Sequence, residues 1–303
     1  MARNPAEIID RRRLKRRLNF WRIAAVVAVI AAVLTLASNF EDTGFSDHVA
    51  RLEISGIILN DPVRDKALRR VARRGAVKAL IVEIDSPGGT FVGGEALYNH
   101  LRSVAEQKPV VAVMGGTATS AAYMAAIGTS RVFAHNGTVT GSIGVIMQTA
   151  DITGMLEKLG IKPETVKSGP LKAQPNPIEP FLPAAREATE VVVGDLFAMF
   201  VDIVATRRKI DRDKVVALSD GRVYSGRQAR KAGLVDAIGG VAEARRWLAE
   251  NHQVDAGLPL KDLDLHDDDE PWRYFIDSVV GKTLFSERLR LDGVLSVWQP
   301  KLK

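Results

Sequence analysis

Two residues of the sequence, Ser120 and Lys172, have the types and local context for nucleophilic chemistry. An apolar run at 110–114 is typical of a strand, ends in a Gly-Gly turn, and is followed by Ser120 at the start of a predicted small-residue helix. A helix start offers backbone N–H groups and a dipole that favour negative charge, which suits a nucleophile with an oxyanion transition state. The alternative is that Ser120 simply caps the helix, since serine is a favoured N-cap residue.

Lys172 lies in a loop interrupted by glycine and prolines, residues 166–177 (VKSGPLKAQPNP). The sequence has no G-x-S-x-G elbow, and its five histidines show no arrangement that indicates a catalytic triad. A serine enzyme without histidine needs another base, and a lysine can serve if burial lowers its pKa so that it is neutral. Taken by itself, a loop lysine is more often simply solvated, because lysine is rarely buried unless it is paired.

Two unbroken apolar runs, residues 78–84 and 110–114, are predicted to be strands that position these groups. Neither run alternates with polar residues, which is typical of strands buried on both faces of a sheet. The first run ends in a turn at 85–89 (DSPGG), where glycines let backbone N–H groups approach a substrate carbonyl closely. An ordinary strand-to-helix connection is the simpler interpretation, because proline and glycine are common turn residues.

Five segments of the sequence occur in an order and at spacings that resemble a known family. They are DSPGG at 85–89, MGGTATSAAYMAA at 114–126, TGSIGV at 140–145, KSGPLK at 167–172 and GRVYSGRQARKAGLVDAIGG at 221–240. Together they resemble the signal peptide peptidase A family, the S49-type serine proteases, in its short single-repeat form. The resemblance extends over roughly residues 49–250, and five ordered motifs are far more specific than any one of them.

The resemblance implies an α/β fold of crotonase/ClpP-like repeated β-β-α units and a Ser–Lys dyad that hydrolyses peptides in or near a membrane. It places the nucleophile on Ser120 and the general base on Lys172, with the backbone N–H groups of Gly89 and Ala121 as the oxyanion hole. The chain departs from the family at Ala121 and Ala122, where glycines often follow the nucleophile. Alanine keeps the backbone N–H, but two added methyl groups could narrow the substrate groove or shift specificity.

The resemblance also implies the partners of the protein. It predicts a ring-like homo-oligomer in which Lys172 of a neighbouring subunit can complete the dyad, with peptides as substrates. No cofactor or metal is required by this chemistry.

Residues 1–22 carry eight basic and two acidic residues, so the net charge of +6 belongs to this segment and the remainder sums to zero. The high pI therefore gives no support for nucleic-acid binding by the body.

The amino terminus predicts the location of the protein. Residues 23–38 are uncharged and mostly apolar, and basic residues before such a run place the N-terminus in the cytoplasm and the body outside. A cleaved signal peptide is the alternative, but the run exceeds the usual apolar region of about 7–15 residues. We expect a single-pass protein of the bacterial inner membrane with an extracytoplasmic, periplasmic catalytic domain. The predicted divisions are a basic cytoplasmic tail (1–22), a transmembrane anchor (23–40), a protease domain (46–250) and a C-terminal extension of unassigned role (251–303).

Helical periodicity predicts further helices at 67–76, 95–107, 183–209 and 241–250. The longest of them carries an apolar stripe, which favours a core or subunit contact over a substrate site. The stripe includes Val192, Leu196, Phe200 and Ile203. In the extension, the acidic stretch 262–271 is typical of a solvated loop, and its spacing does not match an EF-hand calcium site.

The residues and the resemblance together predict a membrane-anchored serine endopeptidase that degrades remnant signal peptides or other membrane-associated peptides. Two alternatives stay open. A crotonase-like enzyme acting on acyl thioesters would use the turn at 85–89 for an oxyanion and leave Lys172 incidental. A catalytically silent membrane scaffold would use Ser120 and Lys172 only structurally.

Overall fold

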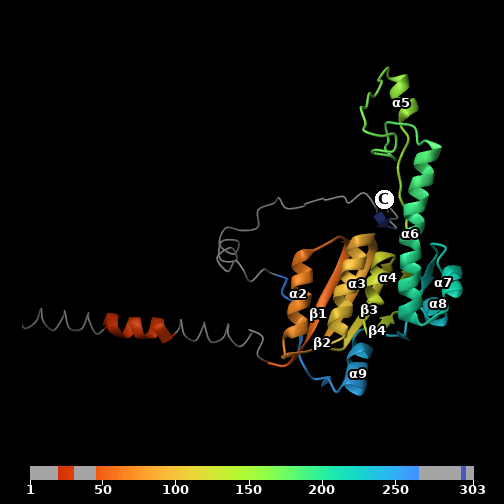
Figure 1. Cartoon of the computed structure of the whole chain (residues 1–303). Helices are drawn as coiled ribbons and strands as arrows, with labels where there is room; N and C mark the ends of the chain where they lie inside the picture. The colour runs from red at the N-terminus through yellow and green to blue at the C-terminus, as the bar shows by residue number, and fades with distance from the viewer. Residues whose placement is uncertain (1–19, 31–45, 266–294, 298–303) are drawn as a thin grey trace, which may run out of the picture. The chain divides into compact units, whose positions relative to one another are not determined.

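The computed structural model describes residues 20–30, 46–265 and 295–297 (Figure 1). The chain divides into two compact units, Met1–Asp47 and His48–Lys303. In the first unit, residues 20–30 are helical. Across the described ranges, no helix combines the length and apolar character needed to cross a membrane. Most of the predicted anchor lies outside those ranges.

The second unit is an α/β structure built on a mixed sheet, which confirms the predicted class. Its central strands β1 (His48–Ile58), β2 (Val77–Thr90) and β3 (Val110–Thr119) run parallel in the order β3-β2-β1, with β8 (Leu260–Asp262) beyond β1. The remaining described strands are β4 (Arg131–Ala134), β5 (Val139–Gly141), β6 (Val223–Ser225), β7 (Ala237–Ile238) and β9 (Leu295–Val297). Among the described residues, β5 pairs antiparallel with β6, and β9 pairs antiparallel with β2.

Helices cover both faces of this sheet. Alternate residues of β2 face opposite sides: Leu80 and Val82 join one buried cluster, whereas Ala79 and Ile81 join another. The described helices of this unit are α2 (Pro62–Arg73), α3 (Phe91–Ala105), α4 (Ala121–Ala126), α5 (Thr153–Lys158), α6 (Pro183–Arg208), α7 (Arg212–Leu218), α8 (Gly226–Lys231) and α9 (Val241–His252). The first cluster packs under α2, α3 and α4, and the second packs under α9. The unbroken apolar runs are therefore buried on both faces of the sheet, as predicted.

The strands β2 and β3 are both longer than the sequence pattern predicted. β3 does not end at its Gly-Gly pair but changes partner there, pairing with β4 over 111–114 and with β5 over 117–119. The Asp85 carboxylate stabilises this change of partner by accepting the N–H of Thr117 over 2.9 Å. β2 likewise continues through 85–89 as a strand, so the prediction of a turn there is wrong.

The predicted helices form, with differences at their ends and in burial. α2 begins at Pro62 rather than 67, because Asp61 caps it by accepting the N–H groups of the next turn and proline is favoured at the first helical position. α6 matches its prediction to within one residue. Of the residues in its apolar stripe, Phe200 is buried in the core, whereas Val192, in the N-terminal half of the helix, is 46% exposed.

Candidate active site

Ser120 lies in a backbone conformation that few non-glycine residues adopt. It joins β3 to α4 with φ 56° and ψ −121°, and only 2% of its surface is exposed. Such conformations cost about 1–3 kcal/mol and cluster at functional sites, where the surrounding structure enforces them. Here the enforcement is a pair of backbone hydrogen bonds, from Ser120 N–H to Gly141 O (2.8 Å) and from Met124 N–H to Ser120 O (2.9 Å).

The prediction that Ser120 opens a helix is confirmed, but the serine does not act as a conventional cap. Its side chain makes no capping hydrogen bond to α4, and its φ lies far from the extended value usual at an N-cap. α4 is six residues long and entirely buried. The capping interpretation therefore does not account for a serine in this strained turn.

β2 carries Gly89, the predicted oxyanion donor, past the Ser120 turn. A Cβ added to Gly89 would lie 1.8 Å from the carbonyl oxygen of Ile58 on β1, so only glycine fits at this position. The hydroxyl of Thr119 donates to the carbonyl oxygen of Pro87 over 3.0 Å and joins this part of β2 to the residue just before Ser120. The structure thus brings the segment around Gly89 and the Ser120 turn together.

Ala121 and Ala122, which follow Ser120, both lie in the interior of the protein. A Cβ added to Gly94 of α3 would lie 2.7 Å from the Cβ of Ala121, so this methyl group faces α3. Ala122 is 0% exposed and belongs to the main core cluster. Neither residue lines the pocket that opens beside Ser120.

A pocket of about 600 Å³ opens beside Ser120. Part of the pocket lining comes from α6, near the middle of that helix. The rest comes from Ser120 and from the segments after β5 and before β6. Its mostly apolar lining suits an apolar peptide side chain. The lining residues are Ser120, Ser142, Gly144, Val145, Ile146, Glu190, Val193, Gly194, Phe197, Ser219, Asp220 and Gly221.

Sequence reasoning assigned no role to Ser142, although its motif was part of the resemblance. Ser142 also has a positive φ, 49°, and its N–H donates to Arg222 O over 2.9 Å. Two serines in strained conformations thus line one pocket. The positive φ of Ser142 cannot be read from its residue type, because it depends on the hydrogen bonds between the segment at β5 and the segment at β6.

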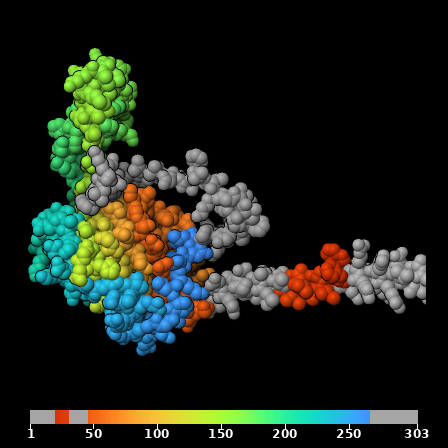
Figure 2. Space-filling model, turned by 180° about the vertical axis from the view of Figure 1, so that it is seen from behind, coloured from red at the N-terminus to blue at the C-terminus, as the bar shows by residue number. Residues whose placement is uncertain are grey.

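Lys172, the predicted base, does not line this pocket. It is exposed and lies in residues 146–182, here called the arm, which contain α5 and extend away from the sheet (Figure 2). Its backbone N–H donates to Gly169 O over 3.2 Å. Within one chain, the structure therefore does not bring Lys172 to Ser120.

A carboxylate organises the loop of the arm that carries Lys172. Glu179 accepts a hydrogen bond from the ammonium of Lys167, and its Oε2 also accepts from Gln174 Nε2 (2.6 Å) and Asn176 Nδ2 (3.0 Å). The hydrogen bond from Lys167, followed by that from Asn176, lowers the pKa of Glu179 to about 2. Lys172 is thus held on a loop with an internal polar framework, although the loop itself is exposed.

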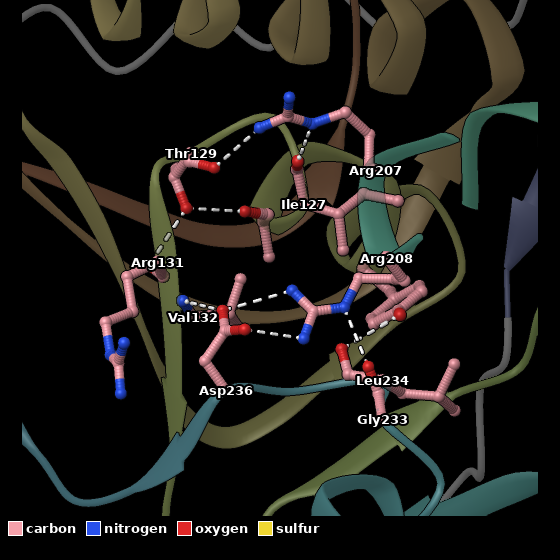
Figure 3. A network of polar contacts seen from close by, with 11 residues as sticks. Ile127, Thr129, Arg131, Val132, Arg207, Arg208, Gly233, Leu234 and Asp236 are labelled. Carbon is pink, nitrogen blue, oxygen red and sulfur yellow. Dashed lines mark hydrogen bonds and ion pairs between the residues drawn. The ribbon is translucent and has the colours of Figure 1, made fainter. Parts of the chain in front are cut away.

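Arg207, near the end of α6, fixes the C-terminal end of α4 (Figure 3). Arg207 donates through Nε to Ile127 O (2.8 Å) and through Nη2 to Thr129 O (2.9 Å). Ile127 is the C-cap residue of α4, so Arg207 satisfies carbonyl groups that the helix end leaves unpaired. α4 is therefore held at Ser120 by the sheet and at Ile127 by α6.

Arg208 forms a two-pronged ion pair with Asp236, with Nη2–Oδ1 at 2.7 Å and Nη1–Oδ2 at 3.0 Å. Asp236 also accepts the N–H of Val132, which ties β4 to the same carboxylate. Burial by itself would raise the pKa of Asp236, but the hydrogen bonds and charge of Arg208 outweigh it and lower that pKa.

The chain is similar to a known family of peptidases. Residues 102–255, about half of the chain, match the model of peptidase family S49. A candidate protease from Synechocystis sp. is 36% identical over 226 residues, covering 74% of this chain and 80% of the relative. A candidate signal peptide peptidase from Enterococcus faecium is 35% identical over 173 residues, covering 57% of this chain and 50% of the relative.

Among solved structures, the chain is similar to a mutant of a membrane-bound stomatin-specific protease, with a TM-score of 0.47 and 15% sequence identity. The match covers 72% of this chain and 98% of the other chain. The family match includes β3, Ser120 and α4. The chain therefore belongs to peptidase family S49 and is a serine peptidase, a hydrolase.

Proposed function

We propose that the protein is a membrane-anchored endopeptidase with a crotonase/ClpP-like catalytic unit, in which Ser120 is the nucleophile and Lys172 the general base. The observation that carries the proposal is the strained, buried Ser120 turn beside Gly89, with an apolar pocket opening next to it. A peptide carbonyl at this turn would meet a hydroxyl oxygen together with the backbone N–H groups of Gly89 and Ala121. That combination suits formation of a tetrahedral intermediate.

In the proposed reaction, the Ser120 hydroxyl oxygen attacks the peptide carbonyl carbon as neutral Lys172 takes the hydroxyl proton. The oxyanion that forms is held by the two backbone N–H groups. The C–N bond then breaks, and the protonated Lys172 gives its proton to the leaving amine. Water hydrolyses the acyl-enzyme by the same steps, which releases the new carboxylate and regenerates Ser120. No metal or nucleotide takes part in these steps.

Lys172 reaches Ser120 from a neighbouring copy in a ring-like oligomer. The arm and the start of α6 expose large apolar side chains to an extent that favours burial against another chain. They include Met155 (54%), Leu159 (66%), Ile161 (51%), Leu182 (49%) and Val191 (68%), with Val166 fully exposed.

The proposed substrates are remnant signal peptides or other membrane-associated peptides, which match the apolar pocket. We place the anchor at 23–40 in the bacterial inner membrane, with the N-terminus in the cytoplasm and the catalytic unit outside. The support for this placement is the basic segment 1–22 and the apolar run after it. Alkylation of single cysteines introduced at positions 5 and 250 in intact and permeabilised cells tests the orientation.

Peptide hydrolysis by the full chain in detergent tests the dyad. Ser120→Ala and Lys172→Ala are expected to abolish turnover while retaining the native circular dichroism spectrum, whereas Lys162→Ala, which removes another exposed lysine of the arm, should leave it unchanged. Mixing the two inactive variants during assembly should restore partial activity if the dyad spans subunits. Full activity of Lys172→Ala would overturn the assignment. Hydrolysis of acyl-CoA but not of peptides would favour a thioester enzyme instead.

A further inference from the structure

The strand β2 contains an irregularity directly before the proposed oxyanion glycine. Ser55 of β1 lies opposite Asp85, whereas Ile57, two residues further along β1, lies opposite Gly88, three residues further along β2. β2 therefore holds one extra residue at this point, which makes a β-bulge. Bulges bend a strand and are over-represented next to active sites, where they change the direction in which a group points.

The buried side chain of Ser86 replaces backbone pairing at this bulge. Its hydroxyl donates to the carbonyl oxygen of Gly56 on β1 over 2.6 Å and accepts the N–H of Gly88 over 3.1 Å. Both glycines have a positive φ, 66° at Gly56 and 108° at Gly88. Pro87, the residue between Ser86 and Gly88, has no N–H to donate, and proline inside a sheet is tolerated at bulges. One hydroxyl group thus joins the two strands where their regular pairing is interrupted.

A second buried hydroxyl holds the bulge from β3. Thr119, the residue before Ser120, donates its hydroxyl to the carbonyl oxygen of Pro87 over 3.0 Å. Ser86 also lies opposite Ala118 in the pairing of β2 with β3. The bulge is therefore tied to β1 by the Ser86 hydroxyl and to the start of the nucleophile's turn by the Thr119 hydroxyl.

We propose that Ser86 and Thr119 are positioning residues, whose hydroxyl groups hold the Gly88–Gly89 peptide so that the Gly89 N–H points at the oxyanion beside Ser120. The inference rests on the proposed function, in which this N–H is an oxyanion donor. Ser86 fixes one side of the peptide through the N–H of Gly88, and the close approach of Gly89 to β1 fixes the other side. A donor aimed in advance stabilises the developing charge without reorganisation during the reaction.

Peptide hydrolysis by the full chain in detergent tests these roles. Ser86→Ala and Thr119→Val are each expected to lower kcat by about tenfold or more, with KM changed by less than about twofold. Removal of a whole oxyanion donor costs roughly 10²–10³ in kcat, and a donor that points the wrong way loses part of that. The affinity for a peptide boronate, which forms a tetrahedral adduct with a serine, should fall by the same factor as kcat/KM, because both report binding of the tetrahedral state.

Thr138→Val is the matched control for the loss of a buried hydroxyl. The Thr138 hydroxyl donates to the carbonyl oxygen of Gly115 over 2.7 Å and accepts the N–H of His135 over 2.9 Å, but it lies between β4 and β5. This variant should lose stability in urea as Ser86→Ala does and keep kcat. An unchanged kcat in Ser86→Ala or in Thr119→Val would overturn the inference, as would an equal loss of kcat in the control.

A second readout does not depend on turnover. In the Ser120→Ala background, amide hydrogen exchange over residues 85–92 is expected to be faster with Ser86→Ala than without it, because the N–H of Gly88 loses its acceptor. Thr138→Val should leave exchange over these residues unchanged. If the wild-type protein cleaves no peptide, the proposed function fails. Equal exchange with and without Ser86→Ala would instead overturn the hold of Ser86 on the Gly88–Gly89 peptide.

Discussion

The helix that begins after Ser120 meets its neighbour at Gly94 and Ala121. A Cβ built on Gly94 would lie 2.7 Å from the Cβ and 3.1 Å from the Cα of Ala121, which is closer than real side chains approach. α3 and α4 therefore touch through a position where one helix has no side chain. Because Ala121 directly follows Ser120, this contact also helps to position the Ser120 turn.

Gly94→Ala should therefore damage both stability and activity. The added methyl group must push α4 outward, at a cost of about 1–3 kcal/mol in the free energy of unfolding, measured by urea denaturation. The same shift moves the Ser120 turn and should lower kcat/KM roughly tenfold or more. Gly194→Ala in α6 is the matched stability control, since nothing lies within 4 Å of its added Cβ. It should raise stability by up to about 1 kcal/mol.

Replacing Ser120 by glycine should stabilise the protein relative to replacing it by alanine. Both variants lose the Ser120 hydroxyl group, but alanine keeps the strain of φ 56°, whereas glycine adopts this conformation freely. Thermal or urea unfolding should show Ser120→Gly more stable by about 1 kcal/mol.

The control for this pair of variants is Ser103, which is exposed within α3. There the order should reverse, with Ser103→Gly less stable than Ser103→Ala by about 1 kcal/mol, because glycine is unfavourable inside a helix. If glycine were also the less stable replacement at position 120, the strain would not be a property of the turn in solution.

The local features of this fold were predictable from the sequence, because they follow from the periodicity of neighbouring residues. The strand cores at 78–84 and 110–114, the helix after Ser120 and the whole of α6 were all predicted. Each depends on propensity and on which face of one element is apolar. The α/β class, in contrast, was predicted from the resemblance to a known family.

The features that the sequence did not predict depend on residues far apart in the chain. β2 extends through Gly89 because β1 and β9 supply partners on both edges, and no pattern within 85–89 reveals them. Asp236 was assigned no role, since its partner Arg208 lies 28 residues earlier. The distance of Lys172 from the pocket within one chain also lay beyond sequence reasoning, because it depends on how the arm leaves the sheet.

Breaking the ion pair of Arg208 with Asp236 should be strongly destabilising. Only 10% of the Arg208 side chain and 28% of the Asp236 side chain are exposed. Removing either partner therefore leaves the other as an unpaired charge that water solvates poorly. Arg208→Met should lower the free energy of unfolding by about 3 kcal/mol, and a double-mutant cycle with Asp236→Asn should show strong coupling.

The exposed pair Arg212–Asp202 serves as the control for this measurement, with side chains that are 54% and 60% exposed. Arg212→Met should cost less than about 1 kcal/mol, because water screens the pair. Equal effects of the two arginine substitutions would contradict the structural role assigned to Arg208.

Acid should loosen the arm through Glu179. Its pKa in the folded protein is about 2, below its ordinary value of 4.5, because Lys167 and then Asn176 hydrogen-bond to the charged carboxylate. A lowered pKa means that the ionised form is the one that stabilises the fold, so the contribution is fully present above pH 4.5. It is lost as the pH falls from there towards 2. Hydrogen exchange over residues 160–180 should therefore accelerate across this range, relative to exchange in the central strands.

Glu179→Gln should remove that pH dependence and leave the arm exchanging faster already at neutral pH, since an amide is a weaker acceptor for Lys167. Glu164→Gln, which changes another carboxylate of the arm, is the matched control and should retain the wild-type profile. Because the arm carries Lys172, Glu179→Gln should also lower kcat more than it changes KM if the lysine acts as the base, and kcat should recover partly in Glu179→Asp. An unchanged exchange profile in Glu179→Gln would show that the carboxylate does not organise the loop, and the position of Lys172 would then have to be set by the neighbouring subunit alone.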